Sequence, residues 1–421
     1  MIRKLFVLLL AVANCSLIYA QTIKTDVLVI GRTPSGIAAA IQSARSKVKT
    51  VLAGSNENTT AGILSVHAGS DLPSGIWSEF CTKVHEFYKE KPSFDTDDNG
   101  SLKFEGTTEA LILEKIADTV KNLNIYSNSL FTSIKKDGDR WEVRLKQNEK
   151  SMVIKARVLV DATENGEVAT RLNTKAANGI TNINYQTKAY RTSIASAANL
   201  SFIPLRDIVA KGADNIFVTE KIIPGEKNIQ FLPMQLELGQ GAGAAAAYCA
   251  FFKTTTKNLK VRIIQGEILD FKGGLLPFTD IPQHDRDWRA VQQVAATGML
   301  KGVSPGGAVP QFLFRPDSVV VTSEVKPILT EIYTRAFLWF NREKPGDKFT
   351  VGNMLSLISD YTLTEPQVLK STIQKAWKSQ YKFKLDFDPG RPITRREFAV
   401  LANRFLNPFA RTVDLEGRLV N

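Results

Sequence analysis

The chain has 421 residues and is basic, with 54 Lys and Arg against 42 Asp and Glu, a formal net charge of +12. Its length allows two or three domains, and its hydrophobic content of 43% is ordinary for globular protein. Three cysteines exclude a disulfide framework, and with three scattered histidines they offer no ligand spacing for a metal site.

The first 20 residues have the pattern of a secretory signal peptide. Arg3 and Lys4 precede an apolar run over residues 5–13, and the small residue Ala20 follows. A lipoprotein signal that uses Cys15 is the alternative. No later stretch is long and apolar enough for a membrane span, so we expect an exported protein, periplasmic or at the cell surface, with no transmembrane segment in the mature chain.

The excess of positive charge has two interpretations. In an exported protein it favours contact with acidic cell-envelope polysaccharide or lipid head groups, and nucleic acid is not an expected partner. The other interpretation is a well-solvated basic surface without a specific partner.

Residues 26–54 predict a strand, a tight turn, a helix and a returning strand. The apolar run 26–30 is typical of a buried strand, and the turn over residues 31–36, GRTPSG, leads into an alanine-rich helix. Such a unit places free backbone N–H groups at a helix start, where a pyrophosphate can bind. Thr33 takes the middle glycine position of the dinucleotide fingerprint, and Gly54 stands where an acidic ribose ligand is expected. A phosphate-binding unit and a plain α/β core unit therefore both remain open.

The next segments alternate between helix and strand patterns. A polar loop with His67 comes first, and residues 77–90 and 106–122 have amphipathic helical patterns. Residues 125–135, 140–146 and 152–160 predict strands, of which the last two flank a polar turn. This antiparallel piece interrupts a parallel sheet that the final strand resumes before Asp161.

Several blocks, in order, resemble the FAD-dependent oxidoreductases of exported bacterial type, which have the two-dinucleotide-fold flavoprotein architecture. The blocks are GRTPSGIAAAI (31–41), TAGI (60–63), Phe104-Glu105, VDAT (160–163) with Gly166, IPLR (203–206), ADNIFV (213–218) and LGQGAGAAAA (238–247). Together they cover roughly residues 23–265.

The resemblance implies an α/β fold for residues 21–272: a Rossmann-like FAD/NAD(P)-binding fold with an antiparallel β insertion. Only a reduced substrate domain fits between Thr163 and Gly239. The implied cofactor is FAD, and the implied partner is a small-molecule substrate. The implied cofactor-binding residues are Gly31, Thr33, Pro34, Ser35, Gly36, Ala61, Gly62, Ile63, Asp161, Ala162, Thr163, Gly239 and Gly241.

Gly239 and Gly241 precede an alanine-rich run, and the resemblance makes them the start of the closing helix. Unpaired N–H groups and the positive end of the helix dipole would then face the flavin. A small-residue helix packed tightly on a sheet is the alternative.

Residues 273–421 predict a small α-helical domain with an internal repeat. Phe314 and Glu324 align without gaps, at an offset of 73, on Phe387 and Glu397, so two related helical units are the simplest account. Blocks such as FTDIP (278–282) and FDPGRPITRREF (387–398) resemble S-layer homology modules, which bind polysaccharide through a Thr-Arg-x-Glu helix start. A helical domain that only stabilises the α/β part is the alternative.

The preferred function is an FAD-dependent oxidoreductase that acts on a small or carbohydrate-derived substrate. Its catalytic residues are unknown, and His67, Tyr185 and Arg191 are guesses. The alternatives are a non-catalytic scaffold with the flavoprotein fold and a protein that binds envelope polysaccharide.

Overall fold

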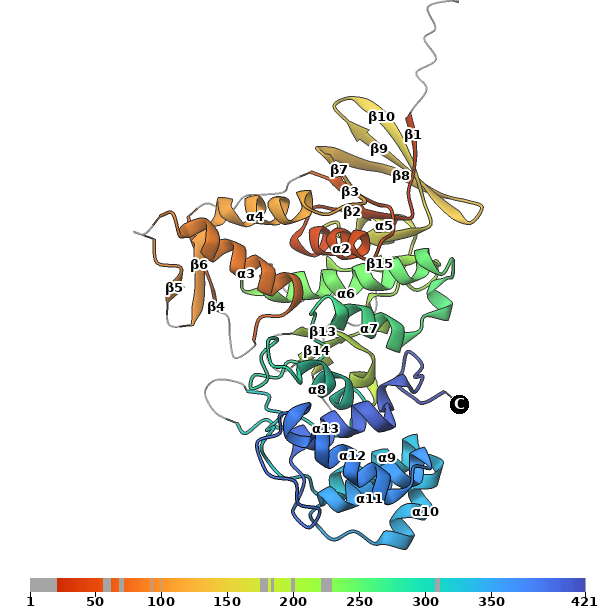
Figure 1. Ribbon diagram of the computed structural model, residues 1–421. Helices are drawn as coiled ribbons and strands as arrows, with labels where there is room; N and C mark the ends of the chain where they lie inside the picture. The colour runs from red at the N-terminus through yellow and green to blue at the C-terminus, as the bar shows by residue number, and fades with distance from the viewer. Residues whose placement is uncertain are drawn as a thin grey trace, which may run out of the picture.

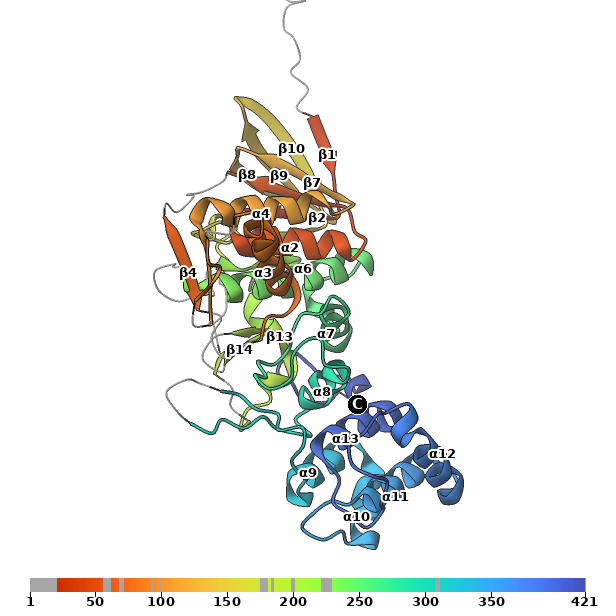
Figure 2. The same ribbon diagram turned by 60° about the vertical axis from the view of Figure 1, so that its left-hand side comes forward.

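A computed structural model describes residues 21–55, 62–67, 72–91, 94–98, 100–174, 181–182, 185–197, 201–220, 229–306 and 311–420. Figures 1 and 2 show an α/β part that extends to about residue 270 and a helical part that ends at the C-terminus. The predicted signal peptide and Ala61 lie outside the described residues.

A five-stranded parallel sheet forms the centre of the α/β part. Its strand order is β15-β11-β2-β3-β7. The bounds are β2 Val27–Ile30, β3 Thr50–Gly54, β7 Leu123–Ser127, β11 Val158–Asp161 and β15 Ile216–Val218. Strands β2, β3 and β11 are buried throughout, as their continuous apolar sequences predict. The predicted parallel α/β sheet is confirmed.

Helices α2 (Pro34–Arg45) and α6 (Leu232–Phe251) pack against one another beside this sheet (Figure 1). The contact is close because it uses glycines. A Cβ on Gly239 would lie 2.2 Å from the Ser35 carbonyl oxygen, and one on Gly243 would lie 2.4 Å from that of Ala39. Any larger side chain would push the two backbones apart.

The expectation that the closing helix begins at Gly239 is wrong. Helix α6 begins at Leu232, with Pro233 in its first turn, so Gly239 and Gly241 lie inside it. Gly241 faces the other side, where a Cβ would lie 2.7 Å from the Ile194 carbonyl oxygen. The small residues of this segment therefore serve packing on both faces, which is the alternative that the sequence left open.

A second sheet, β1-β10-β9-β8, covers one side of the parallel sheet. Its bounds are β1 Gln21–Lys24, β8 Ser129–Asp137, β9 Arg140–Gln147 and β10 Lys150–Ala156. The strands predicted over 125–135 and 152–160 are each divided between the two sheets. Asn128, in the left-handed region at φ 51°, separates β7 from β8, and Arg157 separates β10 from β11.

The remaining elements of the α/β part lie around this core. Helices α3 (Gly75–Tyr88) and α4 (Gly106–Asp118) pack beside a small antiparallel sheet of β4 (Ile63–His67), β5 (Asp97–Asp98) and β6 (Ser101–Glu105). A further small sheet contains β12 (Thr181–Asn182), β13 (Ser193–Ala197) and β14 (Ser201–Pro204). Short helix α5 (Glu167–Arg171) follows β11, and α7 (Val261–Asp270) follows α6.

The C-terminal part is helical, as expected. Its helices are α8 (Trp288–Ala295), α9 (Thr322–Ile332), α10 (Thr334–Glu343), α11 (Val351–Thr362), α12 (Pro366–Ser379) and α13 (Arg395–Leu401), the last continued by a π-helical turn over Ala402–Leu406. Large buried aromatic side chains, among them Trp339, Phe349 and Phe398, fill its core.

Three short extended segments of this part close a ring of backbone hydrogen bonds. Val320 N–H donates to the Ile393 carbonyl (3.0 Å), Ile393 N–H to Phe349 (2.9 Å), and Phe349 N–H to Val320 (3.0 Å). Each segment leads directly into a helix, namely α9, α11 or α13. The segment at Phe349 is thus a third unit beside the two that the sequence repeat reveals.

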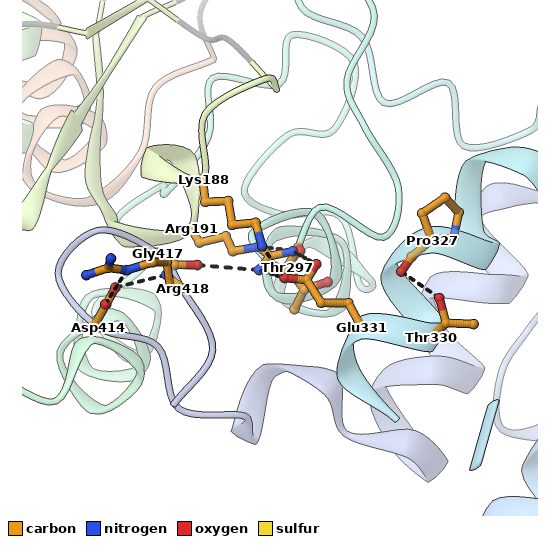
Figure 3. A network of polar contacts seen from close by, with 9 residues as sticks. All are labelled: Lys188, Arg191, Thr297, Pro327, Thr330, Glu331, Asp414, Gly417 and Arg418. Atoms are coloured by element: carbon orange, nitrogen blue, oxygen red, sulfur yellow. Dashed lines mark hydrogen bonds and ion pairs between the residues drawn. The ribbon is translucent and has the colours of Figure 1, made fainter. Parts of the chain in front are cut away.

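A buried arginine joins the two parts of the chain (Figure 3). Arg191, 1% exposed, follows the β12 segment and donates to both carboxylate oxygens of Glu331 on α9, at 3.1 and 2.7 Å. It also donates to the carbonyl oxygens of Thr297 and Gly417. Lys188 pairs with the same Glu331 carboxylate. One guanidinium therefore connects four distant segments.

Within the described residues, no helix combines the length and the apolar character that crossing a membrane requires. The side chains described also include no cluster of three or more His, Cys, Asp or Glu arranged to hold a metal ion. Cys81 and Cys249 are both free thiols.

Candidate functional site

A cavity of about 640 Å³ lies at the carboxyl ends of β2, β3 and β11. In parallel α/β sheets this edge is where ligands bind, because the turns into the helices expose their backbone there. Helix α4, the start of β8 and the first turn of α6 complete its walls through Glu109, Glu114, Phe131 and Gln235.

One end of the cavity is built by the turn before α2. A Cβ on Gly31 would lie 2.1 Å from the Ala162 carbonyl oxygen, and one on Gly36 would lie 2.2 Å from the Gly31 carbonyl oxygen, so both positions need glycine. Thr33 is the N-cap of α2: its Oγ1 accepts from Gly36 N–H and donates to the Ala162 carbonyl. The backbone N–H groups of Arg32 and Thr33 bond to no other described residue. These donors and the positive end of the helix dipole suit a phosphate.

The turn after β11 is held by Asp161, which is fully buried. One carboxylate oxygen accepts from the Thr163 hydroxyl (2.6 Å) and backbone N–H (3.2 Å), and the other accepts from Ala169 N–H (2.8 Å). Asp161 thereby positions Ala162 and Thr163, which line the cavity, without lining it itself.

The same turn contributes a buried ion pair to the cavity wall that the sequence did not reveal. A Cβ on Gly54 would lie 3.3 Å from Arg32 Cγ, so the Arg32 side chain runs across the strand end where an acid was expected. Its guanidinium donates to Glu114 Oε1 on α4 (2.5 Å) and to Ser127 Oγ at the end of β7 (2.8 Å). The Arg32 side chain is 3% exposed and that of Glu114 is 39% exposed.

Glu109, in the first turn of α4, also lines the cavity. Burial raises the pKa of its carboxyl from 4.5 to about 7, because desolvation disfavours the charged form. A carboxyl with this pKa can hold or release a proton near neutral pH. The sequence placed it only among the acidic residues of a helix start, and nothing there indicates its burial.

The residues predicted to bind the cofactor fall into two groups. Gly31, Thr33, Pro34, Ala162 and Thr163 line the cavity. Those that do not line it, among the described residues, are Ser35, Gly36, Gly62, Ile63, Asp161, Gly239 and Gly241.

Two of the residues that do not line the cavity have clearly different surroundings. Ser35 Oγ is buried and donates to Glu220 Oε1 (2.6 Å) beneath the α2 start. Ile63 is 67% exposed at the start of β4.

Two of the guessed catalytic residues have structural contacts instead. The Tyr185 hydroxyl accepts from Gly302 N–H at 2.8 Å, and Arg191 lies in the network that joins the two parts of the chain. Neither lines the cavity. The side chain of His67 is outside the described part of the structure.

The Thr-Arg-x-Glu sequence of the helical part is used inside the protein. Thr394 and Glu397 form a capping box at the start of α13, and Glu397 also pairs with Arg391. Arg395, 5% exposed, donates to both carboxylate oxygens of Glu324 at 2.7 and 2.6 Å. These contacts connect the first and last helical units.

The cavity residues fit an FAD group at its phosphate portion. The glycine turn, the Thr33 cap and the amides of Arg32 and Thr33 lie at the cavity, and the turn packs so closely on the β11 end that a Cβ on Gly31 would collide with the Ala162 backbone. The ribose portion differs from the usual arrangement, since Gly54 has no side chain and Arg32, which lies against it, pairs with Glu114.

Residues 26–202 match the FAD dependent oxidoreductase family. The match covers less than half of the chain and includes β2, α2, α4, β11 and all of the residues that line the cavity except Ile229 and Gln235. No curated protein matches the chain by sequence.

Solved structures of several enzymes are similar to part of the chain. They include p-nitrophenol 4-monooxygenase PnpA from Pseudomonas putida DLL-E4 (14% identity, TM-score 0.28, 38% of this chain and 45% of that one). Another is the rebeccamycin biosynthetic enzyme RebC with reduced flavin (14% identity, TM-score 0.28, 38% of this chain and 37% of that one). A third is OxyS anhydrotetracycline hydroxylase from Streptomyces rimosus (16% identity, TM-score 0.26, 38% of this chain and 35% of that one). The chain spans less than half the length of these proteins.

Proposed function

We propose that this protein is an FAD-binding oxidoreductase, exported to the periplasm or cell surface, that acts on a small or carbohydrate-derived substrate. The observation that carries the proposal is the cavity at the carboxyl edge of the parallel sheet, with the glycine turn of α2 at one end. The family match over residues 26–202 supports the same cofactor. Bound FAD would supply the acceptance and release of a hydride or electrons.

The chain's own contribution is to bind and orient the cofactor. Gly31, Thr33 and the Arg32 amide would hold the phosphates, and Ala162 and Thr163 would line the cavity beside them. Glu109 is the described cavity carboxyl that can hold a proton at neutral pH, and we propose it as the group that exchanges one with substrate.

The test is whether the purified mature protein carries flavin. We expect a yellow protein whose flavin absorbance is released on denaturation, or a colourless one that takes up FAD with quenched flavin fluorescence. Gly31→Val, whose side chain would displace the Ala162 and Thr163 backbone at the cavity wall, should abolish uptake. Gly138→Val, in an open hairpin turn with no neighbour within 4 Å of its Cβ position, is the control at another left-handed glycine. A folded wild-type protein that neither contains nor takes up flavin would leave only the scaffold function.

For the helical part we propose structural support of the α/β part. Arg395 and Glu397 are engaged in internal ion pairs, and Arg191 docks this part on the β12–β14 region. Binding of an acidic envelope polysaccharide is the alternative proposal, and a pull-down on cell-wall polysaccharide with the mature protein tests it.

A further inference from the structure

The cavity has a carboxylate near the end of β3, but it comes from a helix and not from the strand. In dinucleotide-binding folds an acid at the end of the second strand accepts from the ribose hydroxyls. Here that position is Gly54, and Arg32 covers it. The only acidic side chain that Arg32 bonds among the described residues is Glu114 on α4.

Three observations place this carboxylate at the ribose position. Arg32, Gly54 and Glu114 line the same cavity, together with Ser55 and the start of β8. The guanidinium of Arg32 bridges the strand end to α4, with 2.5 Å to Glu114 and 2.8 Å to Ser127. The Arg32 side chain is almost fully buried, whereas 39% of the Glu114 side chain is accessible.

We propose that Glu114, held in place by Arg32, binds the ribose hydroxyls of the adenosine half of the cofactor in place of the acid missing at position 54. The inference rests on the proposed FAD-binding function. A carboxylate has about four acceptor sites, so Glu114 can accept from Arg32 and from a ribose diol together. An ion pair that fixes one carboxylate oxygen also fixes the direction of the other.

The opposite assignment, in which Arg32 binds a ribose 2′-phosphate, fits less well. Both terminal nitrogens of Arg32 already donate to protein oxygens, and its Nε is shielded from solvent without a partner in the described structure. A 2′-phosphate would also lie against the Glu114 carboxylate. The site therefore selects adenosine with free ribose hydroxyls.

The first experiment uses the unaltered mature protein. ADP, 2′,3′-dideoxy-ADP, AMP and adenosine 2′,5′-bisphosphate compete with FAD, and binding is followed by flavin fluorescence. Hydrogen bonds to a charged group predict at least about a 10-fold preference for ADP over the dideoxy compound. The bisphosphate should also bind more weakly than AMP, which has the same single 5′-phosphate and a free 2′-hydroxyl.

The second experiment uses Glu114→Gln, which keeps the shape and removes the charge. FAD affinity should fall at least about 10-fold, and FMN, which lacks adenosine, should bind with unchanged affinity. Glu164→Gln, at another wall of the same cavity, is the matched control, and it should leave FAD binding equal or tighter because it removes a negative charge near the phosphates.

The outcomes separate the two proposals. Equal competition by ADP and dideoxy-ADP in a protein that binds FAD overturns the role of Glu114 and leaves the proposed function intact. That competition test stands even if Glu114→Gln fails to fold because Arg32 loses its partner. A folded wild-type protein that binds neither FAD nor ADP overturns both.

Discussion

Glu109 gives the cavity a pH-dependent charge. Its pKa of about 7 lies above the ordinary value of 4.5, so folding favours the protonated carboxyl. This contribution to stability is fully present below about pH 4.5 and is lost as the pH rises through about 7. The free energy of unfolding of the protein is thus expected to fall toward alkaline pH.

Glu109→Gln should therefore stabilise the protein at pH 8, by about 1–3 kcal/mol, and have little effect near pH 4.5. Urea unfolding at the two pH values measures the difference. Glu149→Gln, in an exposed hairpin turn with an 88% exposed side chain, should change stability by less than about 0.5 kcal/mol at either pH. A gain that is equal at both pH values would contradict the assigned pKa.

At this scale the sequence located part of the cavity wall. Gly31, Thr33 and Pro34 are consecutive or nearly so, and their local geometry follows from residue type. Glu114 follows Arg32 by 82 positions, and no local pattern connects them. Their pairing depends on how α4 packs beside α2, which is a property of the tertiary structure.

At the scale of elements, the contact between α2 and α6 is the most tightly specified. Gly239 and Gly243, one helical turn apart, both face α2 at a distance that excludes a Cβ. The sequence showed a small-residue helix, but its glycines suggested a start at Gly239, whereas Pro233 marks the first turn nearer the beginning of the chain. The helix start was therefore misplaced, and the packing alternative was the correct one.

Gly243→Ala should destabilise the protein by about 1–3 kcal/mol, because its Cβ would overlap the Ala39 backbone. Gly266→Ala is the control: it lies inside α7, and nothing is within 4 Å of its Cβ position. Alanine is the better helix former there, so we expect a gain of about 0.5–1 kcal/mol. Thermal or urea unfolding gives both values, and a neutral Gly243→Ala would show that the helices can separate without cost.

The strand order was predictable only in outline. Apolar runs with turn signals located β2, β3 and the antiparallel hairpin, because their periodicities are local. The division of residues 123–137 between two sheets occurs at one left-handed residue, Asn128. The sequence around it has a continuous β pattern, so this break was not predicted. The third helical unit at Phe349 was missed because its helix start has Asn353 where the others have glutamate.

At the scale of the whole molecule, the Arg191 network controls how the helical part is attached. Arg191 and Lys188 lower the pKa of Glu331 to about 2, first through the hydrogen bond from Arg191. A depressed carboxyl pKa contributes stability that is present above about pH 4.5 and is lost as the pH falls toward 2. Acid should therefore weaken the attachment.

Glu331→Gln should lower stability at pH 7 by about 1–2 kcal/mol, a value reduced for the partial solvent exposure of the carboxylate. The difference from wild type should shrink as the pH falls from 4.5 to 3. Urea unfolding across this range measures it, with exposed Glu90→Gln as a control expected to be neutral. A loss that is independent of pH would mean that packing, not charge, joins the two parts.

The ring of hydrogen bonds among Val320, Phe349 and Ile393 has a consequence for folding. Each segment gives one bond and receives one, so two segments alone leave a donor and an acceptor without partners in the protein interior. Linear repeat arrays can fray from one end, because each unit contacts only its neighbours. A closed ring has no end, so the helical part should melt as a single cooperative unit, and a chain cut before Ile393 should lose all three units together.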